Sequence, residues 1–590
     1  MPAYNHGGGG SVLRPRRPTV RHAVFADWLK RLRAGLSSIL LVYGMAAIAL
    51  VLVSISLIGD LVGSITPGFD FGSFTIVNYL AVFTDPQLLP VLERTFLQGL
   101  GTIVVMSVFG VPIAWLIART DIPGKNFIIT LLTAQLAIPG FITAMAYAWL
   151  LNPTSGIANR AIVATGFVSD PVIDIYQIGW ICVLQGIAFI PGCVFMILPA
   201  MQSMDLSLEE AAWANGVSTH HTVMRVIVPL LAPTILSAMF FFFVIGIELF
   251  DFIAFIGIPG HVEVISLWIY DAIHSTASLP NYGYAAATGT IMLVLTSIAL
   301  FFYMRCLRQS ERYAVVTGKA RRVSPLPLGR WRPFALTLVA VWLFLAIVLP
   351  ILTLIWTSIV PYLQMPSLAA VSTLTLNNYA LALSYIPIPL AYTLSLIGIT
   401  VGLTLLLSVS GSWVVTRGDD RFGRLINLVV FLSPAVPTMV AAVAFQMAAI
   451  AFHKWIPLYG SITLVAIAMA TRMIAFASRT INSAAFQLHK ELDEAAYASG
   501  LSRFETFREI FLPNVAPALW YSALMVAMLT ARELTLPLMI VTGHSFVLST
   551  LIFDLQTNGE TGPAAALSLV LVIALGTVVF GARNAIGRVR

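Results

Sequence analysis

Apolar runs of about 20 residues alternate with short polar segments along most of the chain. A run of that length can cross roughly 30 Å of hydrocarbon as an α-helix. The pattern predicts twelve membrane-spanning helices, and the expected fold class is an all-α integral membrane protein. Their expected positions are 36–58, 96–118, 127–151, 178–200, 233–257, 285–305, 335–357, 391–415, 426–450, 460–480, 518–541 and 563–582.

The composition agrees with a membrane protein, and the charges indicate its orientation. Of 590 residues, 58% are hydrophobic and 10% are charged, whereas soluble domains have about 45–50% and about 25%. Lys and Arg gather before the first span and in the linker 305–332. Because such residues are retained on the cytoplasmic side, we expect both termini in the cytoplasm. The net charge of +7 is then an orientation signal, and no nucleic-acid partner is expected.

Two polar stretches, 209–233 and 493–517, repeat one another at an offset of 284 residues. Each reads Glu-Ala-Ala, three residues, Gly, then twelve residues to a Pro. Self-similarity of this kind indicates a tandem duplication. The matched positions are Glu210, Ala211, Ala212, Gly216 and Pro229 in the first stretch and Glu494, Ala495, Ala496, Gly500 and Pro513 in the second.

The duplication divides the chain into two halves. Asn78-Tyr79 recurs as Asn378-Tyr379, each after the first span of its half. With six spans per half, the halves run in the same direction and place a translocation path between two similar bundles. We expect a disordered basic tail at 1–35, a first half at 36–307, a basic cytoplasmic linker at 308–334 and a second half at 335–590.

Each repeated stretch predicts a short helix-turn-helix at the membrane surface. Acidic residues open its first helix, where they suit the positive end of the helix dipole. Gly216 and Gly500 allow the left-handed conformation that ends a helix. Ser218 and Ser502 follow as caps of a second short helix, which we expect to close near Pro229 and Pro513, since proline disrupts a helix interior.

The second stretch carries a motif of Glu-Ala-Ala, three residues, Gly, nine residues, then Ile-x-Leu-Pro, complete with Ile510 and Leu512. The first stretch has Val226 and Val228 at the two aliphatic positions. The motif resembles that of the membrane subunits of binding-protein-dependent ABC importers, which have the type I permease fold. In that family the stretch is a coupling helix that binds a groove of an ATPase subunit. The resemblance therefore implies ATPase coupling by Glu210, Ala211, Ala212, Gly216 and Pro229, and by Glu494, Ala495, Ala496, Gly500 and Pro513.

The resemblance also implies partners for this chain. The sequence contains no G-x-x-x-x-G-K-[ST] loop that would bind phosphates. We therefore expect a transport subunit that is not itself an enzyme and binds no cofactor or metal. ATP and Mg would belong to two copies of a cytoplasmic ATP-binding subunit, and a periplasmic substrate-binding protein would deliver the cargo. The resemblance also implies that the spans lie in a bacterial inner membrane.

Ionisable residues within spans mark candidate transport paths. Glu248 and Asp251 lie in the fifth expected span, and Glu533 lies at a matching depth in the eleventh. Two carboxylates facing one axis would attract a cation, although pairing of Glu248 and Glu533 with Arg472 or Arg532 is an alternative. Proline-containing segments break the third and ninth spans, around Pro139 and Pro437, either at the path or as packing kinks.

Having both membrane halves on one chain most resembles the ferric-iron permeases of this family. Oxygen ligands suit a hard trivalent cation, and the carboxylates suit thiamine or a polyamine equally well. Thiamine, phosphonate and polyamine permeases therefore remain alternatives.

Two other classes compete with an importer. A proton-coupled secondary transporter is suggested by Asp420-Arg421-Phe422-Gly423-Arg424, which resembles a loop of facilitator halves. That class does not explain the two matched stretches, and the first half lacks the loop pattern. An integral membrane enzyme lacks support, because His220 and His221 are adjacent and face different sides of a helix.

Overall fold

The computed structural model describes residues 20–68, 73–203, 214–275, 279–313, 326–418, 420–542 and 547–588. In these ranges the secondary structure is helical apart from an isolated bridge between Thr120 and Leu326. Ten of the described helices are long and apolar enough to cross a membrane, and two sharply bent helix pairs bring the number to twelve. The all-α fold class is confirmed, and the ten to twelve candidate spans of the described residues agree with the predicted twelve when each bent pair is counted as one span.

The spans of the first half are formed by seven helices. These are α1 (Val20–Ser64), α3 (Leu88–Arg119), α4 (Lys125–Ala137), α5 (Gly140–Leu151), α7 (Ile178–Ser203), α10 (Val228–Glu248) and α12 (Tyr282–Tyr313). Shorter elements connect them: α2 (Val77–Phe83), α6 (Ile157–Ala164), α9 (Thr219–Thr222), α11 (Ile265–His274) and the π-helical turns η1 (Val223–Ile227) and η2 (Ile253–Gly257).

The second half repeats this order. Its spans are α13 (Arg332–Leu343) with η4 (Phe344–Val348) and α14 (Leu349–Ile359), then α17 (Pro387–Arg417), α18 (Asp420–Leu432) with η5 (Ser433–Ala435) and α19 (Thr438–Ala451), α20 (Ile462–Phe486), α23 (Leu512–Ala531) and α26 (Thr561–Arg588). The connecting elements are η3 (Gly329–Trp331), α15 (Leu368–Val371), α16 (Asn377–Tyr385), α21 (Glu491–Ala498), α22 (Arg503–Thr506), η6 (Phe507–Phe511), α24 (Thr535–Ile540) and α25 (Leu548–Thr557).

The third and ninth spans are broken where the sequence predicts. The chain bends by 88° between α4 and α5, and by 113° at the start of α19. Pro139 and Pro437 stand at the two breaks, and a proline forces the residue before it into an extended conformation. Helices α5 and α19 are almost entirely buried. Irregular backbone at membrane depth requires such burial within protein.

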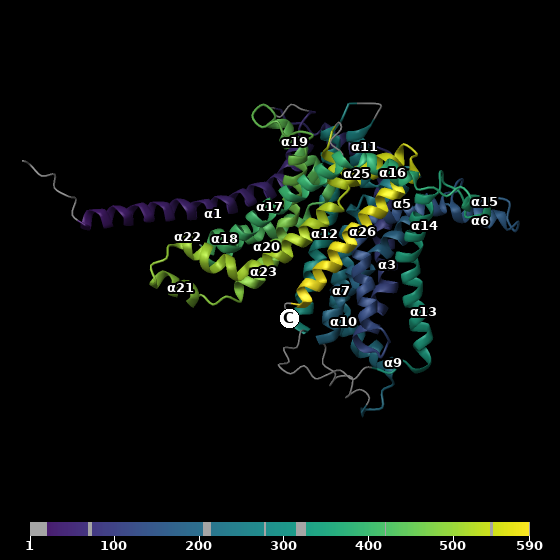
Figure 1. The fold of residues 1–590 in the computed structure, drawn as a ribbon, viewed down its shortest axis with the longest axis horizontal. Coiled ribbons are helices and arrows are strands. Elements are labelled where there is room, and N and C mark those ends of the chain that lie inside the picture. The colour runs from purple at the N-terminus through teal and green to yellow at the C-terminus, as the bar shows by residue number, and fades with distance from the viewer. Residues whose placement is uncertain are drawn as a thin grey trace, which may run out of the picture.

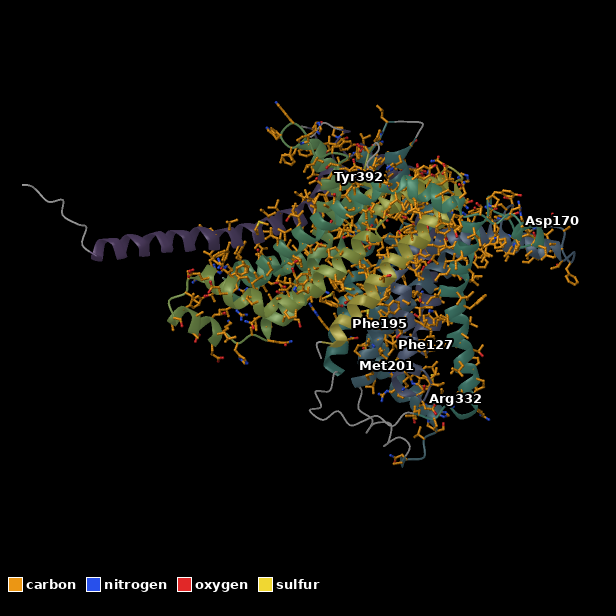
Figure 2. The ribbon with its side chains drawn as sticks, in the orientation of Figure 1. Phe127, Asp170, Phe195, Met201, Arg332 and Tyr392 are labelled. Carbon is orange, nitrogen blue, oxygen red and sulfur yellow. The ribbon has the colours of Figure 1, made fainter. Side chains whose placement is uncertain are left out.

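The first span of each half packs against the other half. Helix α1 contacts α17, α18 and α19, while α13 packs into the core formed by α3, α4 and α7. In that core the indole Nε1 of Trp342 donates to Gln135 Oε1 at 3.0 Å. In Figure 2, Arg332 at the start of α13 lies at the same end as Met201 and Phe127 of the first half. The two bundles are therefore interlocked by their exchanged first spans.

The two bundles meet at one end of the molecule. In Figure 1, α11, α25 and α16 gather at the top, whereas α9 and α21 lie far apart toward the bottom and the left. We name the repeated stretches 209–233 and 493–517 the candidate docking loops, and the end of the molecule that carries α9 and α21 the docking-loop end. Near the opposite end, Trp149 Nε1 donates to Gln556 Oε1 at 2.8 Å, and the hydroxyls of Tyr282 and Tyr459 lie 2.7 Å apart. These hydrogen bonds join the two halves away from the docking loops.

The repeated Asn-Tyr pairs have the same role in each half. Asn78 Nδ2 donates to the carbonyls of Ser64 and Thr66, at 3.0 and 2.9 Å. In the second half, Asn378 Nδ2 donates to the carbonyls of Ser358 and Val360, at 3.0 and 2.8 Å. Each asparagine thus satisfies the free carbonyls at the end of its first span, as a structural duplication requires.

Candidate docking loops and translocation cavity

Helix α21 is the first helix of the second docking loop. Glu491, Asp493 and Glu494 occupy its first turn. Gly500 has φ of +85°, and its N–H donates to Tyr497 O at 3.0 Å, while Leu501 N–H donates to Ala496 O at 3.0 Å. This pair of bonds is a Schellman motif, in which glycine adopts the left-handed conformation without steric cost. The prediction that Gly500 ends the helix is confirmed.

The two sides of α21 differ in exposure. Asp493 and Ala496 are buried against the bundle, with 7% and 5% of their surface exposed. Glu494 and Ala495 are exposed. The face that carries Glu494 is therefore available to a partner, while the face that carries Asp493 fixes the helix to the protein.

The second helix of this loop begins with a capping box. Ser502 Oγ accepts from the N–H of Glu505 at 3.3 Å, and Glu505 Oε2 accepts from the N–H of Ser502 at 2.7 Å. Contrary to prediction, this helix does not close near Pro513. Helix α22 passes through the π-helical turn η6 into α23, and the whole segment Arg503–Ala531 is one helical span. The wider turn just before Pro513 accommodates the missing N–H and the bulk of the ring.

The first docking loop is described in part. Glu210, Ala211 and Ala212 lie outside the described residues. Gly216 has φ of +77°, close to that of Gly500. Helix α9 then passes through η1 into α10, so here too the helix continues past Pro229 where we expected it to close. The described parts of the two loops thus have the same backbone plan.

A cavity of about 370 Å³ lies between the two halves. The residues that line it come from the breaks of the third and ninth spans, from the end of α10, from α20 and from the junction of α23 with α24. All three predicted path residues, Glu248, Asp251 and Glu533, line it together with Arg472 and Arg532. The structure therefore brings carboxylates and guanidinium groups from both halves to one place.

Glu248 is tied to the broken ninth span. Its Oε2 accepts from the N–H of Thr438 at 3.1 Å, at the N-terminus of α19. Its Oε1 lies 3.5 Å from Nη2 of Arg472, whose Nη1 donates to Val436 O at 3.2 Å. A carboxylate suits the positive end of the α19 dipole. The pairing of Glu248 with Arg472, left as an alternative by the sequence, is present in this structure.

Asp251 lies beyond the end of its helix. The fifth span was expected to run to residue 257, but α10 ends at Glu248 and the chain turns. Asp251 consequently reaches the first turn of α5, where a Cβ at Gly140 would lie 2.8 Å from Asp251 Oδ2. Glycine at position 140 permits this close approach of carboxylate and backbone. The apolar sequence around Glu248 contains no pattern from which this turn could have been predicted.

The eleventh span also ends at its charged residues. It was expected to reach residue 541, but α23 ends at Ala531. Arg532 follows and donates to Leu136 O at the break of the third span. Glu533 Oε1 accepts from the N–H of Leu536 at 3.4 Å. The cavity is thus lined by three carboxyl side chains and two guanidinium side chains.

The tandem bundles, the matched docking loops and the cavity between the halves define a membrane permease of the two-half kind. The family described as "Binding-protein-dependent transport system inner membrane component" matches residues 110–312 and 407–588, well over half of the chain. The chain belongs to this family and is a fused permease of the binding-protein-dependent ABC importer class.

Two similar proteins cover most of the chain, and a third covers less than half of it. The ferric transport system permease protein FbpB of Actinobacillus pleuropneumoniae is 26% identical over 532 residues, covering 87% of this chain and 73% of the relative. The putative ferric transport system permease protein FbpB 1 of Haemophilus influenzae is 28% identical over 487 residues, covering 78% and 72%. The sulfate transport system permease protein CysT of Escherichia coli is 25% identical over 239 residues, covering 39% and 80%.

Proposed function

We propose that this chain is the membrane-spanning subunit of an ATP-driven importer that receives its cargo from a periplasmic binding protein and passes it to the cytoplasm. The observation that carries this proposal is the matched pair of docking loops. In each loop a glycine in the left-handed backbone conformation, Gly216 or Gly500, turns the chain at the end of its own bundle. Since the sequence has no phosphate-binding loop of its own, the loops would receive the work of ATP hydrolysis from partners.

Two copies of a cytoplasmic ATP-binding subunit are the partners that this arrangement supports. ATP and Mg would be bound by those subunits, and this chain would bind no cofactor. On the second loop, the exposed Glu494 and Ala495 would enter a groove of the partner, because small residues allow close helix contact. Glu210, Ala211 and Ala212 would do the same on the first loop.

The docking-loop end would then face the cytoplasm of a bacterial cell, with the spans in the inner membrane and both termini inside. The distribution of Lys and Arg supports this orientation. The cargo would enter from the opposite end, where the two halves are joined by the Trp149–Gln556 and Tyr282–Tyr459 hydrogen bonds. Opening of the path to the outside would require these bonds to part.

Ferric iron is the cargo that we propose. Two relatives that cover most of this chain are named as ferric transport permeases. Hard cations prefer oxygen ligands, and Glu248, Asp251 and Glu533 leave the cavity with an excess of carboxylate. That excess favours a cation over an anion such as sulfate. Thiamine and polyamines, which are also cationic, and phosphonate remain the alternatives.

The test is transport by the reconstituted complex. The purified chain, its ATPase subunit and its binding protein are placed in proteoliposomes, and uptake of radiolabelled ferric iron is measured with ATP or ADP on the ATPase side. We expect uptake that requires ATP and the loaded binding protein. Uptake that continues without the ATPase and follows a proton gradient would instead support a secondary transporter. Mass spectrometry of the native binding protein identifies the cargo independently.

The cavity residues are tested in the same assay. Glu533→Gln removes a carboxylate that has no ion-pair partner among the described residues, so assembly should persist while uptake falls. Glu263→Gln, which alters a half-exposed surface pair with Arg94, is the matched control. If uptake by Glu533→Gln is unchanged, Glu533 has a packing role and does not act on the translocation path.

A further inference from the structure

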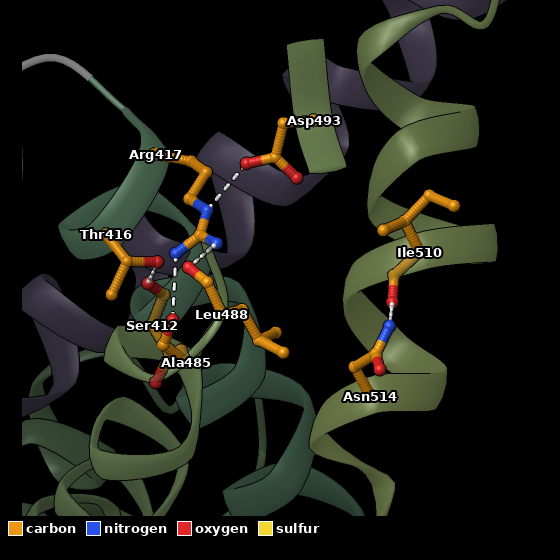
Figure 3. A network of polar contacts seen from close by, with 8 residues as sticks. All are labelled: Ser412, Thr416, Arg417, Ala485, Leu488, Asp493, Ile510 and Asn514. Carbon is orange, nitrogen blue, oxygen red and sulfur yellow. Dashed lines mark hydrogen bonds and ion pairs between the residues drawn. The ribbon is translucent and has the colours of Figure 1, made fainter. Parts of the chain in front are cut away.

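The guanidinium group of Arg417 joins four segments at the docking-loop end. Arg417 is the last residue of α17, and its Nε lies 2.8 Å from Asp493 Oδ2 of α21. Its Nη1 and Nη2 donate to the carbonyls of Ala485 and Leu488, both at 3.0 Å, at the end of α20 (Figure 3). The same group lies 5.8 Å from the ring centroid of Phe511 in η6.

The burial of this contact makes it strong. The side chains of Arg417 and Asp493 are only 6% and 9% exposed. A charge-assisted hydrogen bond in such a site is stronger than a neutral one, and removal of one partner leaves an uncompensated buried charge. Arg417 also satisfies the free carbonyls at the C-terminus of α20, where a cation suits the helix dipole. Asp493 therefore anchors the buried side of α21, while the neighbouring Glu494 stays exposed.

Helix α20 connects this anchor to the cavity. It packs along α17, and Ser408 Oγ of α17 donates to Ile474 O of α20 at 3.4 Å. Arg472 lies about 21 Å along α20 from Phe486, at about 1.5 Å per residue. At that point its guanidinium is 3.5 Å from Glu248, which belongs to the other half. Helix α20 thus has the docking anchor at one end and the inter-half ion pair near its middle.

We propose that Arg417 and Asp493 are positioning residues that make α21, α17 and α20 a single rigid lever. When a partner moves the exposed face of α21, α20 moves with it and Arg472 is displaced relative to Glu248. Without the rigid connection, α21 would move while α20 stayed in place. The inference rests on the proposed function, since it assigns the route by which a docked ATPase would act on the cavity. Arg417 and Asp493 touch neither ATP nor cargo.

The first half has an arginine at the equivalent position. Arg119 ends α3, as Arg417 ends α17, and it is only 2% exposed. The repeat places the acidic residue Glu209 in step with Asp493, and Glu209 lies outside the described residues. The duplication therefore supplies the same pair of residue types to both docking loops.

A distance measurement on the purified chain tests the lever without any partner. Spin labels are attached at Thr463→Cys, near the far end of α20, and at Ala498→Cys, on the exposed side of α21, in a Cys306→Ser background. We expect one narrow distance distribution in the parent chain and a broad one in Arg417→Gln and in Asp493→Asn. Arg508→Gln, which removes an exposed cation of the same segment, is the control and should stay narrow. Equal distributions in all four proteins would overturn the inference.

The reconstituted importer provides the functional measurement. In Arg417→Gln, the ATPase subunit should still copurify with the permease because Glu494 is untouched, while uptake per ATP hydrolysed should fall about fivefold or more. Loss of copurification in proportion to uptake would show a merely structural role and overturn the inference. If Arg417→Gln does not fold, the double variant Arg417→Met/Asp493→Leu, which leaves no unpaired charge, takes its place with the same expected loss.

These outcomes are separate from those of the proposed function. If the parent chain neither binds an ATPase nor transports with ATP, the proposed function fails, while the spin-label distances still report whether α21 and α20 move together. If the parent chain transports and Arg417→Gln transports with equal efficiency per ATP, the lever alone is wrong.

Discussion

The Glu248 carboxylate, at the end of α10 in the first half, lies 3.5 Å from the Arg472 guanidinium of α20 in the second half. Both side chains also bond to the backbone at the break of the ninth span, Glu248 to Thr438 and Arg472 to Val436. The ion pair therefore holds α10, α19 and α20 together at the cavity. Any separation of the halves at this level must break or move it.

Loss of one member of this ion pair should destabilise the protein more than loss of both. Arg472→Gln leaves Glu248 buried without its cation, which typically costs about 3–5 kcal/mol. The double variant Glu248→Gln/Arg472→Gln should recover a large part of that cost, because two neutral amides remain. Thermal unfolding of the detergent-solubilised variants measures the coupling. Strictly additive losses would mean that the two side chains do not interact.

Substitution of the docking-loop glutamates should weaken ATPase binding without unfolding the bundles. Glu494 is exposed on α21, and among the described residues its side chain forms no hydrogen bond or ion pair with the bundle that its loss would break. We expect Glu210→Ala/Glu494→Ala to lose copurification of the ATPase subunit while its melting temperature stays within a degree or two of the parent. Glu560→Ala, an exposed carboxylate beside α25 at the opposite end, is the control. Full transport by the double variant would refute the assignment of these loops.

A side chain at Gly500 should disturb the docking loop through backbone strain. Its φ of +85° is unfavourable for any residue with a Cβ, by roughly 1–2 kcal/mol. Open space surrounds the position, so the effect of Gly500→Ala would come from the backbone alone. We expect faster hydrogen exchange in α21 and reduced ATPase coupling. Gly398→Ala, in the interior of α17 with open space around it, should leave both quantities unchanged.

Asp60 should tolerate loss of its charge. It is fully buried in α1, and Thr290 Oγ1 donates to its Oδ2 at 3.2 Å. Within the described part of the chain its Oδ1 has no hydrogen-bond partner. Because a buried ionised group without a cation is costly, Asp60→Asn should melt at the same temperature as the parent or higher, with transport retained. A folded Asp60→Asn protein that fails to transport would give Asp60 a functional role instead.

Local physical chemistry was enough to predict much of this protein from its residues. The length of the apolar runs sets the number of spans, because a helix must cross the hydrocarbon with its backbone bonds satisfied. Gly500 ends α21 and Ser502 begins the next helix, because their conformational preferences act within a few residues. Pro139 and Pro437 break their spans for the same reason. The duplication follows from the repeated positions alone.

The contacts that connect these elements depend on the tertiary structure. Glu248 and Arg472, and likewise Arg417 and Asp493, are distant in sequence, and no periodicity or spacing pairs one with the other. The ends of α10 and α23 were predicted too late, because apolar composition continues past the points where the buried charges turn the chain. The helix through Pro513 continues because a π-helical turn precedes it. The exchange of α1 and α13 between the bundles was likewise invisible in the sequence, because an apolar face determines that a helix is buried but not which neighbour covers it.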